Sequence, residues 1–132
     1  MQVLSYAAQA AAMRGWPARN EPNGEMKIEV PTEAGRTQVV TISMARDGDG
    51  DAAAFIWSMA GDMRVAADPL ALLRYNMQLT YGKVAIKDQS VVVIHGLHDA
   101  SASLQEIGKA IFWVARAADG LEKGTYGYSD TL

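Results

Sequence analysis

Apolar and polar side chains alternate along three stretches in the first half of the chain. Such a two-residue period is typical of strands that bury one face and leave the other in water. The alternating stretches cover 25–31, 37–45 and 52–60. Pro31 is expected to end the first strand, and an Asp- and Gly-rich turn at 47–51 separates the second from the third. Three consecutive strands joined by short polar turns predict an antiparallel meander.

Apolar residues spaced three and four apart predict three helices. These helices are expected over 2–14, 68–80 and 103–121. Asp68 and Pro69 are favourable first residues for the second helix, and Gly82 is expected to close it in a left-handed turn. Ser103 begins the third helix, where Glu106 three residues later completes a capping box.

A β-hairpin is predicted between the second and third helices. Two runs rich in strand-forming residues, 83–87 and 90–97, are joined by only two residues, which is the length of a tight hairpin turn. Residues 91–94 are all apolar, as in a strand that is buried on both faces. We therefore expect 90–97 to be the central strand of the sheet.

Together these elements predict an α+β fold in the order helix, three-stranded antiparallel meander, helix, β-hairpin, helix. One domain is expected over residues 1–121, because a chain of 132 residues is the size of a single domain. Residues 122–132 are polar and punctuated by glycine. They are expected to form a C-terminal tail that frays or lies over a neighbour.

The charge and the lack of cysteine exclude several classes of function. Twelve basic and fifteen acidic residues give a net charge of −3, and the basic residues are scattered along the chain. Binding to nucleic acid is not expected, because it requires Lys and Arg gathered on one face. The chain has no Cys, which excludes disulfides, thiolate catalysis and Cys-based zinc sites. No apolar run reaches the roughly 20 residues that span a bilayer, and the first residues do not resemble a secretory signal. We expect a cytoplasmic protein with no membrane partner.

The acidic turn resembles the opening of a calcium-binding loop, because Asp47, Asp49 and Asp51 stand at alternate positions. The rest of that pattern is missing. Ala52 occupies the position of the required glycine, and Ser58 occupies that of the closing glutamate. We interpret these residues as a hairpin turn and expect no metal there.

Both histidines lie near the end of the last predicted strand. His95, His98 and Asp99 could contribute to a metal or small-ligand site. Residues three apart on a strand point to opposite faces, however, so the two rings reach one ion only beyond the end of the strand. The other interpretation is that one ring lies on the sheet and the other is exposed or caps a turn. No other spacing marks a nucleophile with its base, so we expect no catalytic centre and no cofactor.

Asn76 lies on an apolar helical stripe, which is an unusual place for an amide. A buried amide needs hydrogen-bond partners at both ends. Asn76 is expected to bond the backbone of the adjoining hairpin or a helix end, with contact to a ligand as the alternative.

Apolar residues of the third predicted strand allow two interpretations. Phe55 and Trp57, together with several of the seven methionines, belong either to the core or to a soft surface that adapts to partners. The first helix raises a similar question. Its face with Leu4 and Ala8 either packs on the sheet or is shared with a partner protein.

The last helix carries more apolar surface than one sheet face requires. Phe112 and Trp113 lie beside its main stripe, and exposed aromatic residues often anchor interfaces. We predict a homodimer with Trp113 at its contact, or else Phe112. The alternative is that the first helix or the C-terminal Tyr126 and Tyr128 cover the Trp113 ring within one chain.

Five segments give the chain a resemblance to a known family. They are LLRYNM at 72–77, GKVAI at 82–86, VVVI at 91–94, LQEI at 104–107 and AAD at 117–119. In this order they resemble the type III secretion chaperone-like fold and, within it, the YbjN family of bacterial proteins. The resemblance implies an α+β domain that often dimerises and binds other polypeptides, without a catalytic centre.

The sequence thus favours a non-enzymatic protein-binding module, chaperone-like or regulatory. Its candidate contact residues are Leu4, Ala8, Phe55, Trp57, Phe112 and Trp113. The alternative is a small-ligand or metal-binding domain that uses His95, His98 and Asp99.

Overall fold

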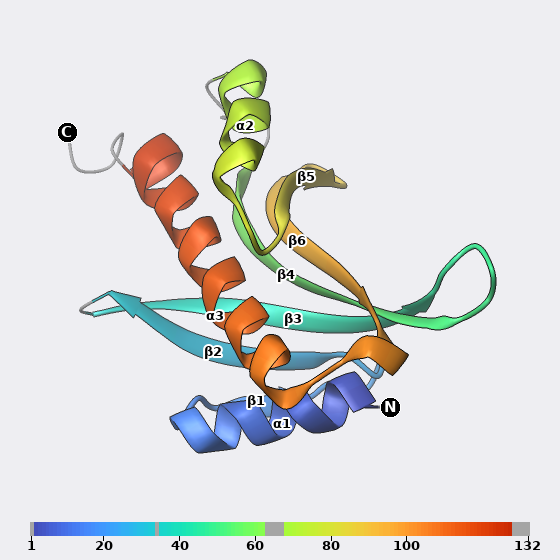
Figure 1. The fold of residues 1–132 in the computed structure, drawn as a ribbon. Coiled ribbons are helices and arrows are strands. Elements are labelled where there is room, and N and C mark those ends of the chain that lie inside the picture. The colour runs from blue at the N-terminus through green and yellow to red at the C-terminus, as the bar shows by residue number, and fades with distance from the viewer. Residues whose placement is uncertain (1, 34, 63–67, 128–132) are drawn as a thin grey trace.

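The computed structural model describes residues 2–33, 35–62 and 68–127. It has the predicted α+β architecture, with one antiparallel sheet and helices packed on one of its faces (Figure 1). In chain order the elements are α1 (Gln2–Arg14), β1 (Ala18–Asn20), β2 (Met26–Glu33), β3 (Arg36–Arg46), β4 (Ala52–Asp62), α2 (Pro69–Tyr75), η2 (Asn76–Gln78), β5 (Lys83–Lys87), β6 (Ser90–His98), η3 (Asp99–Ser101), α3 (Leu104–Leu121) and η4 (Glu122–Gly127).

The sheet has six strands in the order β1-β2-β3-β4-β6-β5, and every neighbouring pair is antiparallel. The predicted meander is β2, β3 and β4. From β4 the chain passes through α2 to the edge strand β5, and the hairpin then returns it as β6 beside β4. The predicted central strand is therefore an interior strand, although β3 and β4 occupy the middle of the sheet. Its residues Val91, Val92 and Val93 are fully buried.

The core lies between the sheet and the helices α1 and α3, which pack against each other on the same face (Figure 1). Ile107 and Ile111 of α3 are completely buried, and each such side chain contributes roughly 1.5–3 kcal/mol. On α1 the buried residues are small, Val3, Ala7 and Ala11 among them, so the two helix backbones can approach closely. At the start of α3, Ser103 Oγ accepts a hydrogen bond from the backbone N–H of Glu106, as the predicted cap requires.

The first part of the sheet differs from the prediction in two places. β2 continues past Pro31 to Glu33, with an irregular register between these two residues. Proline is tolerated there because β1 pairs with β2 only as far as Ile28, so no described strand lies beside Pro31 on that side. Sequence analysis also missed β1, whose three exposed residues show no apolar pattern.

The second helix is shorter than predicted and packs weakly. Asp68 caps α2 by accepting a hydrogen bond from the backbone N–H of Leu70 at 3.0 Å, but α2 ends at Tyr75 and continues only as the short η2. No residue of α2 is buried, and Leu73 and Met77 are 61% and 90% exposed. Leu72 and Tyr75 are half-buried against the core, so only part of the predicted apolar stripe faces it.

Gly82 takes the predicted left-handed conformation, with φ of +87°. It stands immediately before β5 rather than at the end of α2, which ends earlier than predicted. A side chain there would place its Cβ 2.9 Å from Val93 Cγ1, so the turn requires glycine on two counts.

The chain remains helical beyond the expected domain boundary, because α3 continues into the π-helical η4. The predicted covering of Trp113 by Tyr126 and Tyr128 involves side chains outside the described residues. None of the described helices combines the length and the apolar character needed to cross a bilayer.

Candidate functional site

The face of the sheet that α1 and α3 leave open carries large exposed apolar side chains. Along β4, Ala54 and Ile56 are fully buried against the helices. Phe55 and Met59 alternate with them on the other face and are 41% and 51% exposed. No described helix covers this outer face. Phe55 and Met59 therefore lie on the surface rather than in the core, and their binding to partners stays a prediction.

Trp57 lies at the centre of the outer face and is held in a defined orientation. Its indole Nε1 donates a hydrogen bond to Ser43 Oγ at 3.2 Å, and Ser43 Oγ donates to Glu25 Oε2 at 2.7 Å. The hydrogen bond from Ser43 is also the main cause that lowers the pKa of Glu25. Two ammonium groups flank the Trp57 ring, with Lys27 Nζ 5.9 Å and Lys87 Nζ 5.2 Å from its centroid. Such cation–π contacts stabilise an exposed ring by about 0.5–1 kcal/mol each.

Phe55 is also fixed, because its ring lies over a glycine of the neighbouring strand. Phe55 and Gly96 are register partners, and a Cβ at Gly96 would come within 3.0 Å of the ring. The outer face therefore presents two ordered aromatic side chains on one strand.

The other predicted contact residues lie on the helices, on the opposite face of the sheet. Leu4 packs partly against the core, and Ala8 is exposed. Phe112 is half-buried because Trp16 stacks on it, with ring centroids 6.5 Å apart, whereas Trp113 is 49% exposed. The six predicted residues consequently do not form one continuous surface.

A cleft between the α2–η2 segment and α3 was missed by the sequence analysis. It has a volume of about 470 Å³, and Tyr75, Leu79, Tyr81, Trp113 and Arg116 are among its lining residues. The only sequence signal was the spacing of Trp113 and Arg116, which places both on one side of a helix. The second wall could not be foreseen, because the predicted second helix extended through residues that form η2 and a turn.

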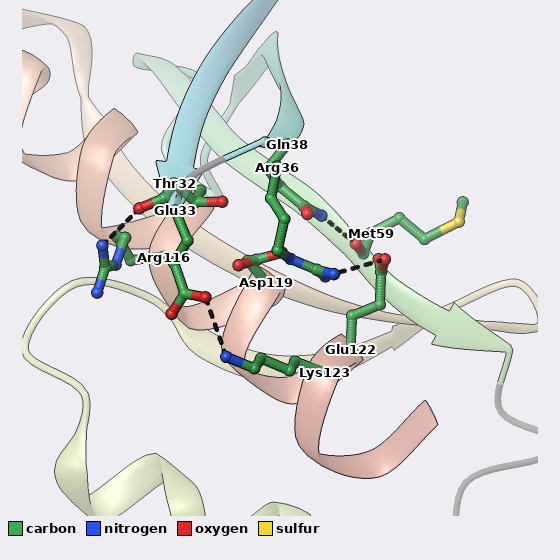
Figure 2. Close-up of polar contacts among 9 residues, drawn as sticks. All are labelled: Thr32, Glu33, Arg36, Gln38, Met59, Arg116, Asp119, Glu122 and Lys123. Atoms are coloured by element: carbon green, nitrogen blue, oxygen red, sulfur yellow. Dashed lines mark hydrogen bonds and ion pairs between the residues drawn. The ribbon is translucent and has the colours of Figure 1, made fainter. Parts of the chain in front are cut away.

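Figure 2 shows a polar cluster that fastens the β2–β3 hairpin to α3 and η4. Arg36 Nε donates to Asp119 Oδ1 at 2.9 Å, and Lys123 Nζ donates to Glu33 Oε2 at 3.0 Å. Asp119 is only 3% exposed. Burial of its carboxyl acts to raise the pKa, but the hydrogen bond and charge of Arg36, together with Thr32 and the charge of Lys123, outweigh burial and hold the pKa of Asp119 below its ordinary value. This cluster is structural in character.

The three residues of the predicted metal or ligand site do not form one group of ligands, although His98 and Asp99 line the same pocket. Asp99 accepts hydrogen bonds from the backbone N–H groups of Gln2 and Val3 and so caps α1. His95 Nδ1 accepts from the backbone N–H of Gly82, and burial lowers the pKa of His95. His98 Nε2 instead lies 2.6 Å from an oxygen of Asp47. Each group has a different partner, in agreement with the opposite-face argument.

The acidic turn brings three carboxylates within 4.8 Å of one another. Its own backbone accounts for this arrangement. Asp47 Oδ1 accepts hydrogen bonds from the N–H groups of Asp49 and Asp51, and the backbone N–H of Gly50 donates to the carbonyl of Asp47. The interpretation as a hairpin turn is confirmed.

Asn76 takes the predicted structural role at the junction of helix and hairpin. Its Oδ1 accepts a hydrogen bond from the backbone N–H of Val84 at 2.5 Å. Lys83 Nζ donates to the carbonyls of Asn76 and Leu79 at 3.0 and 2.7 Å. Together these bonds join η2 to the edge strand β5.

Comparison with known proteins gives structural matches only. No family model and no curated protein matches the sequence. The Yersinia pestis type III secretion chaperone SycH, solved in complex with a stable fragment of YscM2, matches with a TM-score of 0.57 and 16% sequence identity, over 90% of this chain and 98% of that chain. The chaperone–effector complex HopA1–SchA matches with a TM-score of 0.61 and 6% identity, over 91% and 92% of the two chains.

The chain has the fold of the type III secretion chaperones. Identities of 16% and 6% show the fold alone, because one fold can carry unrelated functions. The finer resemblance to the YbjN family is not shown by these comparisons.

Proposed function

We propose that this protein is a non-enzymatic binding module for other polypeptides, with a chaperone-like or regulatory role in the cytoplasm. The outer face of the sheet carries the proposal. Phe55, Trp57 and Met59 form a row of large apolar side chains along β4, in which Phe55 and Met59 are exposed and Trp57 is half-buried. Surfaces of this kind commonly mark interaction sites.

The aromatic side chains of the outer face are held in fixed positions, which supports a binding surface rather than an incompletely folded one. Trp57 is held by a hydrogen bond and two flanking ammonium groups, and Phe55 rests on Gly96. Ordered aromatic side chains lose little conformational entropy when a partner covers them, which favours affinity. The solved structures of similar fold were obtained as complexes, one with a protein fragment and one with an effector.

The experiment is affinity capture with three forms of the full-length protein, followed by mass spectrometry. The wild type is compared with the Phe55→Ser/Met59→Ser double variant and with Ile86→Ser. Ile86 lies on the edge strand and is 55% exposed, so its replacement removes exposed apolar area elsewhere. The proposal requires a polypeptide that the wild type and Ile86→Ser retain and the double variant loses. Equal retention by all three forms contradicts it.

We further propose that the protein forms a homodimer, and the structure offers α2 as the contact. Leu70 and Leu73 are 60% and 61% exposed, and Met77 is 90% exposed. Leu70 and Leu73 belong to α2 and Met77 to η2, so pairing two copies along the α2–η2 segment would cover all three side chains. The sequence-based placement of the contact at Trp113 remains a prediction and is the competing arrangement.

A further inference from the structure

The cleft between the α2–η2 segment and α3 has a composition that differs from that of the protein as a whole. The protein is acidic, with a net charge of −3. The cleft, in contrast, is lined by no carboxylate and by one guanidinium, that of Arg116. Its walls also carry the aromatic rings of Tyr75, Tyr81 and Trp113. Its volume of about 470 Å³ lies within the usual range of ligand sites.

Both walls of the cleft are fixed in the unbound protein. On one side, Tyr81 Oη donates a hydrogen bond to Glu106 Oε2 at 2.6 Å, and Lys83 Nζ donates to the carbonyl of Leu79 at 2.7 Å. On the other side, α3 is held by its buried face against the sheet. The cleft is therefore formed before any ligand arrives, which lowers the cost of binding.

Trp113 and Arg116 are held next to each other by Phe112. The rings of Phe112 and Trp113 meet edge to face, with centroids 5.0 Å apart, and the Arg116 guanidinium carbon lies 5.9 Å from the Phe112 centroid. Arg116 Nη1 donates to the carbonyl of Thr32 at 2.6 Å (Figure 2). A guanidinium has five N–H donors, so this single backbone bond leaves others for a ligand.

No carboxylate of the described chain neutralises Arg116. The acidic side chains of α3 and η4 face other groups. Glu106 bonds Tyr81, and Asp119 and Glu122 face Arg36. The local excess of positive charge favours an acidic ligand.

We propose that this cleft binds an acidic segment of the partner polypeptide. A carboxylate of that segment pairs with Arg116, and an adjacent apolar side chain packs on Trp113. Guanidinium and carboxylate match each other in planar, bidentate geometry, and Trp and Arg are the residues that most often dominate binding energy. The inference rests on the proposed function and deepens it, because it states what kind of segment the partner carries.

The test is a titration of the full-length, nitrogen-15-labelled protein with two short peptides, followed by NMR. One probe is acetyl-Glu-Leu-Glu-Phe-amide, and the other has Gln in place of both Glu residues. The chain has three tryptophans, so the indole signal of Trp113 can be assigned with Trp113→Phe. We expect the acidic peptide to shift that signal in a saturable way and the Gln peptide to bind at least tenfold more weakly.

Three variants separate a specific contact of Arg116 with the peptide from the mere loss of one positive charge on α3. Arg116→Gln is expected to weaken the acidic peptide at least tenfold, and Arg116→Lys is expected to fall between that variant and the wild type. Lys109→Gln removes one charge from the same exposed side of α3 outside the cleft lining, and it is expected to change affinity less than twofold. The melting temperature of each variant checks that it is folded.

Several results would overturn the assignment. These are no shift of the Trp113 signal at millimolar peptide, equal affinity for both peptides, or equal effects of Arg116→Gln and Lys109→Gln.

Binding of N-acetylphenylalanine as tightly as the acidic peptide would make the cleft a small-molecule site. Dissociation of a dimer by Trp113→Ala would assign it to a second copy of the chain. Partner capture through Phe55 and Met59 is measured separately, so the cleft can fail while the proposed function stands.

Discussion

Arg36 and Asp119, 83 residues apart in sequence, form an ion pair in which Arg36 Nη2 lies 2.7 Å from Asp119 Oδ1. Arg36 begins β3, immediately after the turn from β2, and Asp119 is buried near the end of α3. The pair therefore ties one end of the sheet to the helix that carries the core. It also supports the cleft indirectly, because the same hairpin supplies the Thr32 carbonyl that holds Arg116.

Removal of the buried carboxyl is predicted to destabilise the fold. Asp119→Ala removes the partner of Arg36 and is expected to lower the free energy of unfolding by about 1–3 kcal/mol. Glu122→Ala is the matched control, because Glu122 lies farther from Arg36, at 3.7 Å, and is half-exposed. Its loss is expected to cost less than about 0.5 kcal/mol. Urea unfolding followed by circular dichroism measures both, and equal costs would contradict the structural role of Asp119.

Stability is predicted to fall in acid through two carboxyl groups. Hydrogen bonds to Asp99 from the backbone N–H groups of Val3 and Gln2, and the pairing of Asp119 with Arg36, hold both pKa values below the ordinary 3.8. A carboxyl with a depressed pKa stabilises the folded state above its unfolded pKa, and this stability is lost as the pH falls through the folded pKa.

The contribution of these two carboxyl groups to the free energy of unfolding should therefore be constant above about pH 5 and should decrease below about pH 4. Urea unfolding measured between pH 2.5 and 7 gives this profile. The double variant Asp99→Asn/Asp119→Asn should show a shallower decline. A decline as steep as that of the wild type would show that other groups cause it.

Asn76 is predicted to stabilise the fold through its side-chain oxygen as a hydrogen-bond acceptor, a role that the carboxylate of Asp can also fill. Asn76→Leu leaves the backbone N–H of Val84 without its partner and is expected to cost roughly 1–3 kcal/mol. Sequence reasoning favours a larger loss for Asn76→Asp, on the assumption that the side chain is buried. Asn76 is only half-buried, and the Lys83 ammonium lies against its carbonyl, so Asp is expected to be tolerated better than Leu. Melting temperatures of the two variants show which substitution costs more stability.

The oligomeric state is predicted to depend on α2. Multi-angle light scattering at micromolar concentration should give twice the monomer mass of 14.2 kDa for the wild type. Leu73→Asp should shift the protein to monomer, because it places a charge in the proposed contact. Trp113→Ala should leave the dimer intact. The reverse pattern would restore the contact predicted from the sequence, and a monomeric wild type would remove both arrangements.

The order of elements could be predicted from sequence because periodicity and capping are local signals. Ser103 and Asp68 act as the predicted caps, and the alternation along β4 marks a strand. The alternation could not say which side of β4 faces the helices. Sequence analysis therefore left the side of Phe55 and Trp57 open, whereas the structure turns Ala54 and Ile56 toward the helices.

The sites were harder to predict, because they depend on contacts between residues distant in sequence. Asp99 was considered as a metal ligand, yet it caps α1, 96 residues away from Val3. The pairing of Arg36 with Asp119 and the cleft beside Trp113 likewise have no local signature. In contrast, the hydrogen bond of Asn76 to the hairpin backbone was expected from its place on an apolar stripe, although the side chain is only half-buried.

Site-specific photo-crosslinking tests the central claim most directly. A photoreactive p-benzoylphenylalanine is placed at Phe55 on the outer face, and in a control protein at Asp88, which lies in the exposed β5–β6 turn. After irradiation of living cells, the adducts of both proteins are identified by mass spectrometry. The account predicts that position 55 yields one or a few defined polypeptide adducts, distinct from the dimer, that position 88 does not yield. Identical adducts at both positions, or none at position 55, would contradict binding of partner polypeptides on the open face of the sheet.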